Sequence, residues 1–205
     1  MAQPDPAPGR EGIVPQMKAE ILSLRTLHEG WTRFSLARVR LADGSEAERE
    51  IEDHGNSVGV LPYDPARRVA TLVRELRVPA LYVAGEQSQL EAPAGLIDDG
   101  TPEDNARREV LEEAGLRLGN LDFVGATYSC GGISTERLHL FLAAYAATDR
   151  VDGGGGADGE HENIRVVEIP LAELARMADR CELTDLKTLT LVLALRARRP
   201  ELFAG

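Results

Sequence analysis

Gly95-Leu-Ile-Asp-Asp-Gly-Thr-Pro-Glu-Asp-Asn-Ala-Arg-Arg-Glu-Val-Leu-Glu-Glu-Ala-Gly-Leu116 is the stretch of sequence that decides the fold. It contains a glycine-led loop, a short acidic helix and a glycine stop. Thr101-Pro102 is a favourable helix start, because a proline in the first turn loses no hydrogen bond that the helix needs. Gly115 is a favourable C-terminal stop. We therefore predict a helix between these two signals.

Three glutamates gather on this predicted helix. Glu109 and Glu113 lie one turn apart, and Glu112 lies beside Glu109. Like charges at this spacing repel each other, so the cluster weakens the helix unless a cation lies nearby. A divalent metal with oxygen ligands is the natural cation, and magnesium then indicates a phosphate-containing substrate. The alternative interpretation is a solvated acidic helix.

The run Arg108-Glu-Val-Leu-Glu-Glu-Ala-Gly-Leu116 matches the second half of the Nudix box, so the chain resembles Nudix hydrolases. This half is complete: arginine, glutamate, an aliphatic residue, any residue, two glutamates, any residue, glycine and an aliphatic residue. The first half departs from the usual pattern. The loop from Gly95 is one residue short, and Thr101 stands where a glutamate normally follows Gly100. The complete second half makes the solvated helix the weaker interpretation.

The composition favours a folded enzyme over a nucleic-acid or membrane protein. The chain has 205 residues, of which 43% are hydrophobic, and a net charge of −11. This length suits one domain, or one domain with a small added sheet, and the negative charge argues against nucleic-acid binding. No apolar run of about 18 residues is long enough for a membrane span, and the N-terminus lacks a signal-peptide core. Cys130 and Cys181 have no metal or redox spacing, which favours a reducing cytoplasm.

Three parts of the chain are predicted to differ in structure. Residues 1–16 are rich in proline and glycine and are predicted to form a disordered tail. Residues 17–54 are predicted to form an N-terminal antiparallel β-sheet with a hairpin turn at Asp43-Gly44. Residues 55–205 have the order strands, helix, strands and two helices, which predicts an α/β (α+β) fold, an α/β/α sandwich with a mixed sheet. In this part we expect strands at 57–62, 69–78, 121–128, 138–145 and 164–169, a flexible glycine loop at 153–156, and final helices at 170–179 and, capped by Thr184, up to 198.

Within the Nudix group, the resemblance spans nearly all of residues 19–202 and is closest to bacterial GDP-mannose pyrophosphatases, with ADP-ribose pyrophosphatases next. The GDP-mannose enzymes have the same shortened box. They also resemble this chain in several short stretches: Glu48-Arg-Glu50, Gly55-Asn56, Gly154 to Gly156 with Glu160 to Ile164, Glu168-Ile-Pro170, and Thr184 to Thr188. A departure is Ser129-Cys-Gly-Gly132, where the family usually has Ser-Pro-Gly-Gly. The missing proline weakens the ADP-ribose alternative, because that proline often accompanies ADP-ribose activity.

The resemblance implies a metal site and a proton acceptor. Glu109, Glu113, the backbone carbonyl of Ala94 and Glu162 would bind the metal, which is Mg²⁺, with Mn²⁺ as an alternative. Glu160 or Glu162 would accept the proton from water, and the residues alone leave open which one does. Glu112 would support the cluster, and Arg108 would brace the loop by pairing with a carboxylate.

The resemblance also implies substrate contacts from both folded parts of the chain: Trp31, Arg49, Glu50, Arg77, Gly95, Leu96, Glu136 and Lys187. Arginine and lysine suit a diphosphate, and a tryptophan suits stacking on a base. Each charged or aromatic candidate has a structural alternative. Trp31 would then be a sheet aromatic, Arg49 and Glu50 a cross-strand ion pair, and the remaining charged residues, together with Glu160 and Glu162, surface charges.

The reaction that the resemblance implies is hydrolysis of the pyrophosphate bond of a nucleoside diphosphate sugar, with GDP-mannose giving GMP and mannose 1-phosphate. One alternative is an ADP-ribose pyrophosphatase that forms AMP and ribose 5-phosphate. Another alternative is an inactive Nudix module that senses a ligand. The intact glutamates argue against this alternative. The resemblance further implies a homodimer in which the N-terminal sheets are exchanged, so that Trp31, Arg49 and Glu50 reach the partner's site. Neither a nucleic acid nor a membrane is an expected partner.

Overall fold

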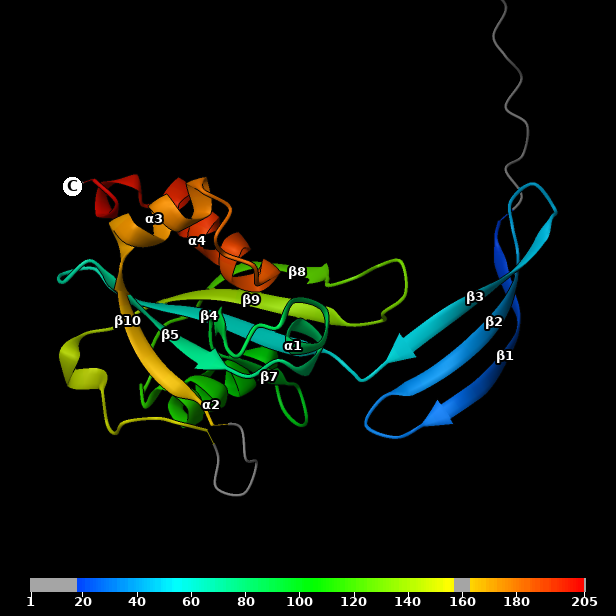
Figure 1. Cartoon of the computed structure of the whole chain (residues 1–205), viewed down its shortest axis with the longest axis horizontal. Coiled ribbons are helices and arrows are strands. Elements are labelled where there is room, and N and C mark those ends of the chain that lie inside the picture. The colour runs from blue at the N-terminus through cyan, green and yellow to red at the C-terminus, as the bar shows by residue number, and fades with distance from the viewer. Residues whose placement is uncertain (1–17, 157–162, 205) are drawn as a thin grey trace, which may run out of the picture. The chain divides into compact units, whose positions relative to one another are not determined.

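The computed structural model describes residues 18–156 and 163–204, which form two compact units, Met1–His54 and Gly55–Gly205 (Figure 1). The predicted tail at residues 1–16 lies outside the described residues, as do Glu160 and Glu162. Within the described part of the chain, no helix is long and apolar enough to cross a membrane.

The first unit is an antiparallel sheet of three strands in chain order within the described residues: β1 (Glu20–Glu29), β2 (Arg33–Arg40) and β3 (Glu46–Asp53). The turn between β2 and β3 is the one that Asp43-Gly44 predicts. Gly44 has a φ of 86°, a conformation that glycine adopts without strain. The Asp43 carboxylate accepts a hydrogen bond of 2.9 Å from the Ser45 backbone N–H, which fixes the turn locally.

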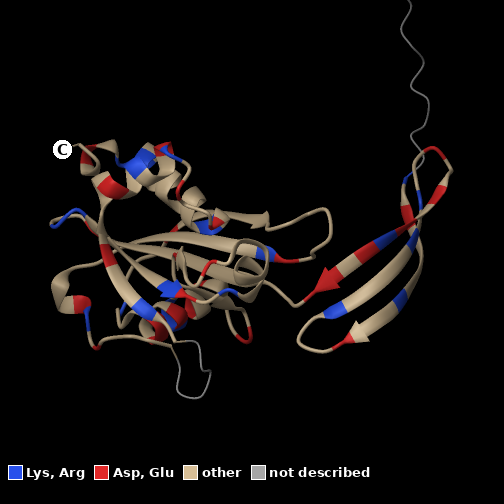
Figure 2. Cartoon of the chain, in the orientation of Figure 1, with Lys and Arg blue, Asp and Glu red and all other residues tan. Residues whose placement is uncertain are grey.

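The two faces of this sheet differ in chemistry. Ile21 pairs with Val39 and Leu24 with Ala37, so these apolar side chains share one face. Ile21 is 63% exposed and Leu24 is 57% exposed. Several residues in register on the other face form ion pairs: Arg38 with Glu46, and Arg40 with Glu20 and Glu46. Figure 2 shows the acidic residues gathered along β3. Exposed apolar side chains concentrated on one face of a sheet are typical of a surface that packs against a partner.

The second unit contains a mixed sheet whose central strands run in the order β10-β5-β4-β9-β8, with β6 pairing with β5 and β7 with β4, among the described residues. β4 and β9 are parallel, and every other pair in this sheet is antiparallel. The strands are β4 (Ser57–Asp64), β5 (Val69–Glu75), β6 (Gln89–Glu91), β7 (Ala94–Leu96), β8 (Asp122–Tyr128), β9 (Arg137–Ala144) and β10 (Arg165–Pro170).

Helices cover both faces of this sheet, as Figure 1 shows. They are α1 (Val78–Ala84), α2 (Pro102–Ala114), α3 (Leu171–Asp179) and α4 (Leu186–Arg198), with short 3₁₀ turns at Ala147–Asp149 and Pro200–Leu202. β9 alternates between the two cores: Phe141 and Ala143 belong to the core with α2, whereas Leu140 and Leu142 belong to the core with α3 and α4. The predicted fold class, an α/β/α sandwich with a mixed sheet after an antiparallel sheet, is confirmed.

Two local predictions were wrong. The expected strand at 69–78 ends at Glu75, and α1 follows it, because Pro79 cannot donate to a sheet and its fixed φ suits the first helical turn. The last helix is capped by Asp185 and not by Thr184. The Asp185 carboxylate accepts a hydrogen bond of 2.9 Å from the Thr188 backbone N–H.

Candidate active site

The start and end of α2 fix the position of the acidic cluster. Thr101 and Asp104 form a capping box, in which each side chain accepts a hydrogen bond from the other residue's backbone. Gly115 ends the helix in a left-handed conformation, with φ of 65°. Between these signals, Ala106 and Val110 are fully buried against the sheet. This packing sets the rotation of the helix and therefore the direction in which its glutamates point.

Glu109 and Glu113 are the two glutamates of α2 that lie against strand β7, and both are buried. The Glu113 carboxylate accepts a hydrogen bond of 3.1 Å from the Ala94 backbone N–H. A Cβ atom on Gly95 would overlap with the Glu109 carboxylate, so only glycine fits at this point of β7. Two carboxylates and the backbone of 94–95 therefore meet at one place.

The charge of this pair makes it suitable for a divalent cation. Buried carboxylates are costly without a compensating positive charge, and hard cations prefer oxygen ligands. In residues 18–156 and 163–204, no group of three His, Cys, Asp or Glu side chains is close enough to hold a metal ion. The third predicted carboxylate ligand, Glu162, lies outside the described residues. The donor set formed by Glu109 and Glu113 fits a Mg²⁺-type ion in ligand chemistry.

Arg108 contacts carboxylates and the loop that precedes α2. It lies 2.8 Å from Glu109 and 3.1 Å from Glu112. It also donates to the Leu96 carbonyl at 3.3 Å and forms an ion pair of 3.4 Å with Asp98. These contacts connect the helix to the loop that begins at Gly95. The geometry is that of a brace, with the guanidinium held among protein oxygens.

The glycine run at 153–156 packs on the C-terminal end of α2. Gly155 and Gly156 donate backbone hydrogen bonds of 2.9 and 3.1 Å to the carbonyls of Glu113 and Glu112. A Cβ atom on Gly154 would overlap with the Glu113 carbonyl oxygen, and its φ is 65°. The glycine-rich composition of this run predicts a flexible loop. Here the glycines allow a close backbone approach that satisfies two carbonyls at the helix end.

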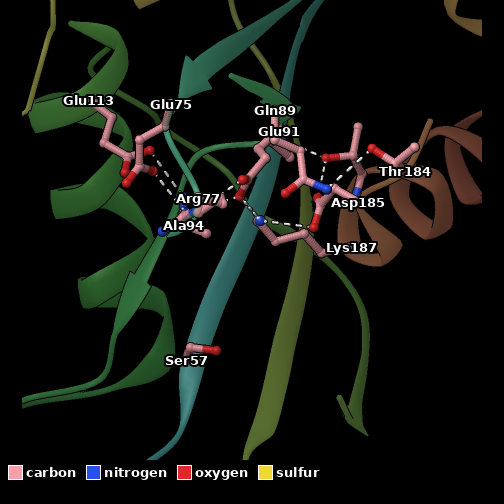
Figure 3. Close-up of polar contacts among 12 residues, drawn as sticks. Ser57, Glu75, Arg77, Gln89, Glu91, Ala94, Glu113, Thr184, Asp185 and Lys187 are labelled. Carbon is pink, nitrogen blue, oxygen red and sulfur yellow. Dashed lines mark hydrogen bonds and ion pairs between the residues drawn. The ribbon is translucent and has the colours of Figure 1, made fainter. Parts of the chain in front are cut away.

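Arg77 and Lys187 converge on one buried carboxylate, that of Glu91 (Figure 3). Arg77 donates to both oxygens of Glu91, at 2.8 and 3.0 Å, and also lies 2.8 Å from Glu75. Lys187 is hydrogen-bonded to Glu91 and lies 3.1 Å from Asp185. Burial favours protonation of Glu91, but the bonds and charges of Arg77 and Lys187 outweigh it and hold the pKa of this carboxyl below its usual range.

The other predicted substrate residue of the second unit, Glu136, precedes β9 and accepts a hydrogen bond from the Ser57 hydroxyl. Ser57 begins β4, so this contact joins the starts of two neighbouring parallel strands. Glu136 is thus held at the end of the sheet where the central strands β4 and β9 begin.

Three predicted substrate residues lie in the first unit. The Trp31 ring stacks on the His54 ring, with centroids 4.9 Å apart and an interplanar angle of 18°. Trp31 is nevertheless 76% exposed. Arg49 donates to the Glu48 carbonyl at 2.8 Å. Arg49 and Glu50 are consecutive in β3, so their side chains lie on opposite faces of the sheet.

The carboxylate partners of the two predicted cations were not predicted from the sequence; they are Glu91, Glu75 and Asp185. The available signal was local: Glu91 stands between Leu90 and Ala92, where a charged residue among apolar neighbours indicates a buried, paired carboxylate. His54 was also missed, because nothing in the sequence links it to Trp31.

Comparisons with known proteins agree with the sequence and the fold. Residues 53–186 match the NUDIX domain. A GDP-mannose pyrophosphatase of Pectobacterium atrosepticum is 40% identical over 146 residues, covering 70% of this chain and 74% of that protein. A GDP-mannose pyrophosphatase of Cronobacter sakazakii is 37% identical over 153 residues, covering 74% and 78%. The crystal structure of an ADP compounds hydrolase superposes with a TM-score of 0.74 over 90% of this chain and 96% of that chain. Its identity is 19%, so it supports the fold alone.

Proposed function

Because this chain belongs to the Nudix family, we propose that it hydrolyses the pyrophosphate bond of a nucleoside diphosphate sugar, with GDP-mannose as substrate and GMP and mannose 1-phosphate as products. The observation that carries the proposal is the buried pair Glu109 and Glu113 against β7. The relatives named GDP-mannose pyrophosphatase favour this substrate over ADP-ribose. An inactive sensing module would have no need of two buried carboxylates side by side on one helix.

The residues that would hold a divalent metal are Glu109, Glu113 and the carbonyl of Ala94, with Glu162 completing the set, and Mg²⁺ is the ion that we propose. When bound, such an ion neutralises charge on the diphosphate and makes water a better nucleophile. Arg108 keeps the helix and the preceding loop in a fixed relation through Glu112 and the Leu96 carbonyl. Glu112 thereby supports the site from an adjacent position.

Glu160 and Glu162 are our candidates for accepting the proton from the attacking water. Support comes from the described ends of the segment that carries them. Gly155 and Gly156 are bonded to the end of α2, and a Cβ atom on Gly155 would lie 3.9 Å from the Ile164 carbonyl oxygen. The described residues that flank this segment therefore lie next to the C-terminal end of the helix that bears Glu113.

A substrate panel tests the function directly. Purified protein with Mg²⁺ is incubated with GDP-mannose, ADP-ribose and other nucleoside diphosphate sugars, and a coupled phosphatase releases phosphate from the products. We expect the largest kcat/KM for GDP-mannose. A larger kcat/KM for ADP-ribose would show that the alternative substrate is the preferred one. Absence of hydrolysis of every nucleotide sugar would contradict the proposal.

Single Glu160→Gln and Glu162→Gln changes are expected to lower turnover much more than they raise KM, because a proton acceptor or metal ligand acts mainly after the substrate has bound. Steady-state kinetics on GDP-mannose measures both constants. Glu86→Gln, a partly exposed position in the loop after α1, serves as the matched control. Full activity in both loop variants would remove these residues from the chemistry.

We also propose that the protein is a homodimer in which the sheet of each subunit covers the partner's substrate site. The apolar face that carries Ile21 and Leu24 is exposed in the single chain, which supports a second copy as its cover. Trp31, Arg49 and Glu50 would then meet the partner's substrate. A two-fold arrangement suits such an exchange, since each site then borrows the same residues.

Mixing two variants that are each inactive tests the proposed exchange of sheets between subunits. Arg49→Ala and Glu113→Gln proteins are each expected to have little activity, and subunit exchange between them should restore part of it. One site of the mixed dimer then has both an intact carboxylate pair and an intact borrowed arginine. Each variant mixed with itself is the control. A monomer by light scattering, or no recovery in verified mixed dimers, would contradict the exchange.

We infer a cytoplasmic location for this enzyme. Cys130 and Cys181 are both exposed and free, a state that a reducing compartment maintains. A nucleotide sugar is also an intracellular type of metabolite, which fits the proposed substrate.

A further inference from the structure

The C-terminal end of α2 has an unfavourable distribution of charge. Its last turn consists of Leu111, Glu112, Glu113 and Ala114, so it carries two carboxylates and no cation of its own. The C-terminal end of a helix bears a partial negative charge, which repels carboxylates and attracts cations. A cation supplied from another part of the chain would therefore stabilise this end of the helix.

Arg150 supplies that cation. Its guanidinium donates a hydrogen bond of 3.0 Å to the carbonyl of Ala114, the last residue of α2. Its backbone forms an isolated β-bridge with Leu116, and the next residue, Val151, donates to the Gly115 carbonyl at 2.9 Å. Carbonyls at a helix end have no partner within the helix, so these contacts satisfy groups that α2 cannot satisfy itself.

Glu168 of β10 holds the guanidinium of Arg150 in this place. Arg150 donates to the Glu168 carboxylate at 3.0 Å, and Arg67 donates to both oxygens of the same carboxylate, at 2.7 and 2.9 Å. The hydrogen bonds from Arg67 are the main cause that lowers the pKa of Glu168 to about 2, so this carboxyl is ionised at neutral pH. Arg67 is itself bound to Asp64 at the end of β4, at 2.7 Å. A chain of ion pairs thus connects two strands of the sheet to the end of α2.

The exposure of these groups indicates that they act on position more than on overall stability. The side chains of Arg150 and Glu168 are each 31% exposed, and both line a cavity of about 480 Å³. Ion pairs that water can reach contribute little to the free energy of unfolding. Glu113 directly precedes Ala114, so any shift of the Ala114 carbonyl also moves the backbone that carries the Glu113 carboxylate.

We propose that Arg150, held by Glu168, is a positioning residue that keeps the end of α2 in register with the sheet and thereby keeps Glu113 beside the Ala94 backbone. The proposal rests on the function proposed above, in which Glu113 binds the metal. A displacement of about 1 Å in such a group can cost about a hundredfold in rate. Arg150 and Glu168 therefore act on hydrolysis without touching the substrate.

Substitutions of the two residues, alone and together, test this role. Arg150→Met removes the charge and both side-chain hydrogen bonds, Arg150→Lys keeps the charge, and Glu168→Gln keeps the shape of the acceptor. Arg176→Met is the matched control, because Arg176 is 59% exposed and pairs with Glu173 within the surface helix α3. Steady-state kinetics with GDP-mannose gives kcat and KM, and melting temperatures report on stability.

Amide hydrogen exchange measured by NMR provides a readout that does not depend on activity. The N–H groups of Gly115 and Leu116 donate to the carbonyls of Leu111 and Val110 at the end of α2. Their exchange reports directly on how firmly this end of the helix is held.

We expect Arg150→Met to lower kcat about tenfold while KM changes by less than about twofold, and to speed exchange at Gly115 and Leu116 about tenfold. Arg150→Lys should recover part of the loss, although a lysine cannot reproduce both directed bonds. Glu168→Gln should have a smaller effect in the same direction. The double variant should be no less active than Arg150→Met, because Glu168 acts through Arg150. Arg176→Met should match the wild type.

A lower melting temperature with unchanged kcat in Arg150→Met would show a merely structural role and overturn the proposal. Losses that add up in the double variant would overturn the link from Glu168 through Arg150. Should Arg150→Met not fold, Arg150→Lys and Glu168→Gln provide the same comparison of kcat with melting temperature. Failure of the proposed function is distinguishable, because the wild type would then hydrolyse no nucleotide sugar, whereas hydrogen exchange would still show whether Arg150 holds the end of α2.

Discussion

Replacing Glu113 by Gln is expected to lower turnover of GDP-mannose about a hundredfold or more, as losses at metal sites do, while leaving the fold intact. Glu113 is 4% exposed, and an amide of the same shape retains the acceptor for the Ala94 N–H. What disappears is one negative charge beside Glu109, and with it much of the affinity for a divalent cation. Steady-state kinetics over a range of Mg²⁺ concentrations measures the loss.

The control for this substitution is Glu103→Gln, which removes the same charge from an exposed position in the first turn of α2. This variant should keep its turnover within about twofold, since surface substitutions change little. Circular dichroism checks that both variants are folded. Near-normal turnover in a folded Glu113→Gln protein would falsify the assignment of Glu113 to the metal site.

Gly95→Ala is expected to have an effect of similar size through geometry alone. The added methyl group would overlap with the Glu109 carboxylate, so that carboxylate has to move away from β7. A displacement of about 1 Å in a catalytic group can cost about a hundredfold in rate. Gly95 does not have a positive φ, so backbone strain contributes little to the loss. Steady-state kinetics with GDP-mannose as substrate measures this loss of rate.

Gly119→Ala is the matched control for this change. A Cβ atom on Gly119 meets no other atom within 4 Å, and its φ is not positive either. The control should therefore retain full activity and stability. If Gly95→Ala were as active as Gly119→Ala, the close contact between β7 and Glu109 would not matter for catalysis.

The sequence predicts those parts of the molecule that local signals determine. α2 is one of them, because Thr101 and Gly115 mark its ends and Ala106 and Val110 provide an apolar stripe. The hairpin at Asp43-Gly44 is another. α1 was not predicted. The strand before it was extended to Val78, since Leu76 and Val78 continue the apolar pattern of β5 and only Pro79 indicates the change.

The contacts of the candidate site depend on distant parts of the chain. Arg77 is separated from Glu91 by 14 residues and Lys187 from Glu91 by 96, so no local pattern shows that the three side chains meet. The glycine run presents the same difficulty. Its composition is typical of a flexible linker, and only the packed helix end shows why residues without a Cβ atom are required there.

The stacking of Trp31 on His54 gives the protein an intrinsic spectroscopic label. Trp31 is the only tryptophan in the sequence, and it belongs to the first unit. In the described residues, the helices all belong to the second unit. Tryptophan emission therefore reports on the small sheet, whereas the far-ultraviolet helix signal reports on the sandwich. Denaturant titrations followed by both signals reveal whether the two units unfold in one cooperative transition or in two, with no dye attached.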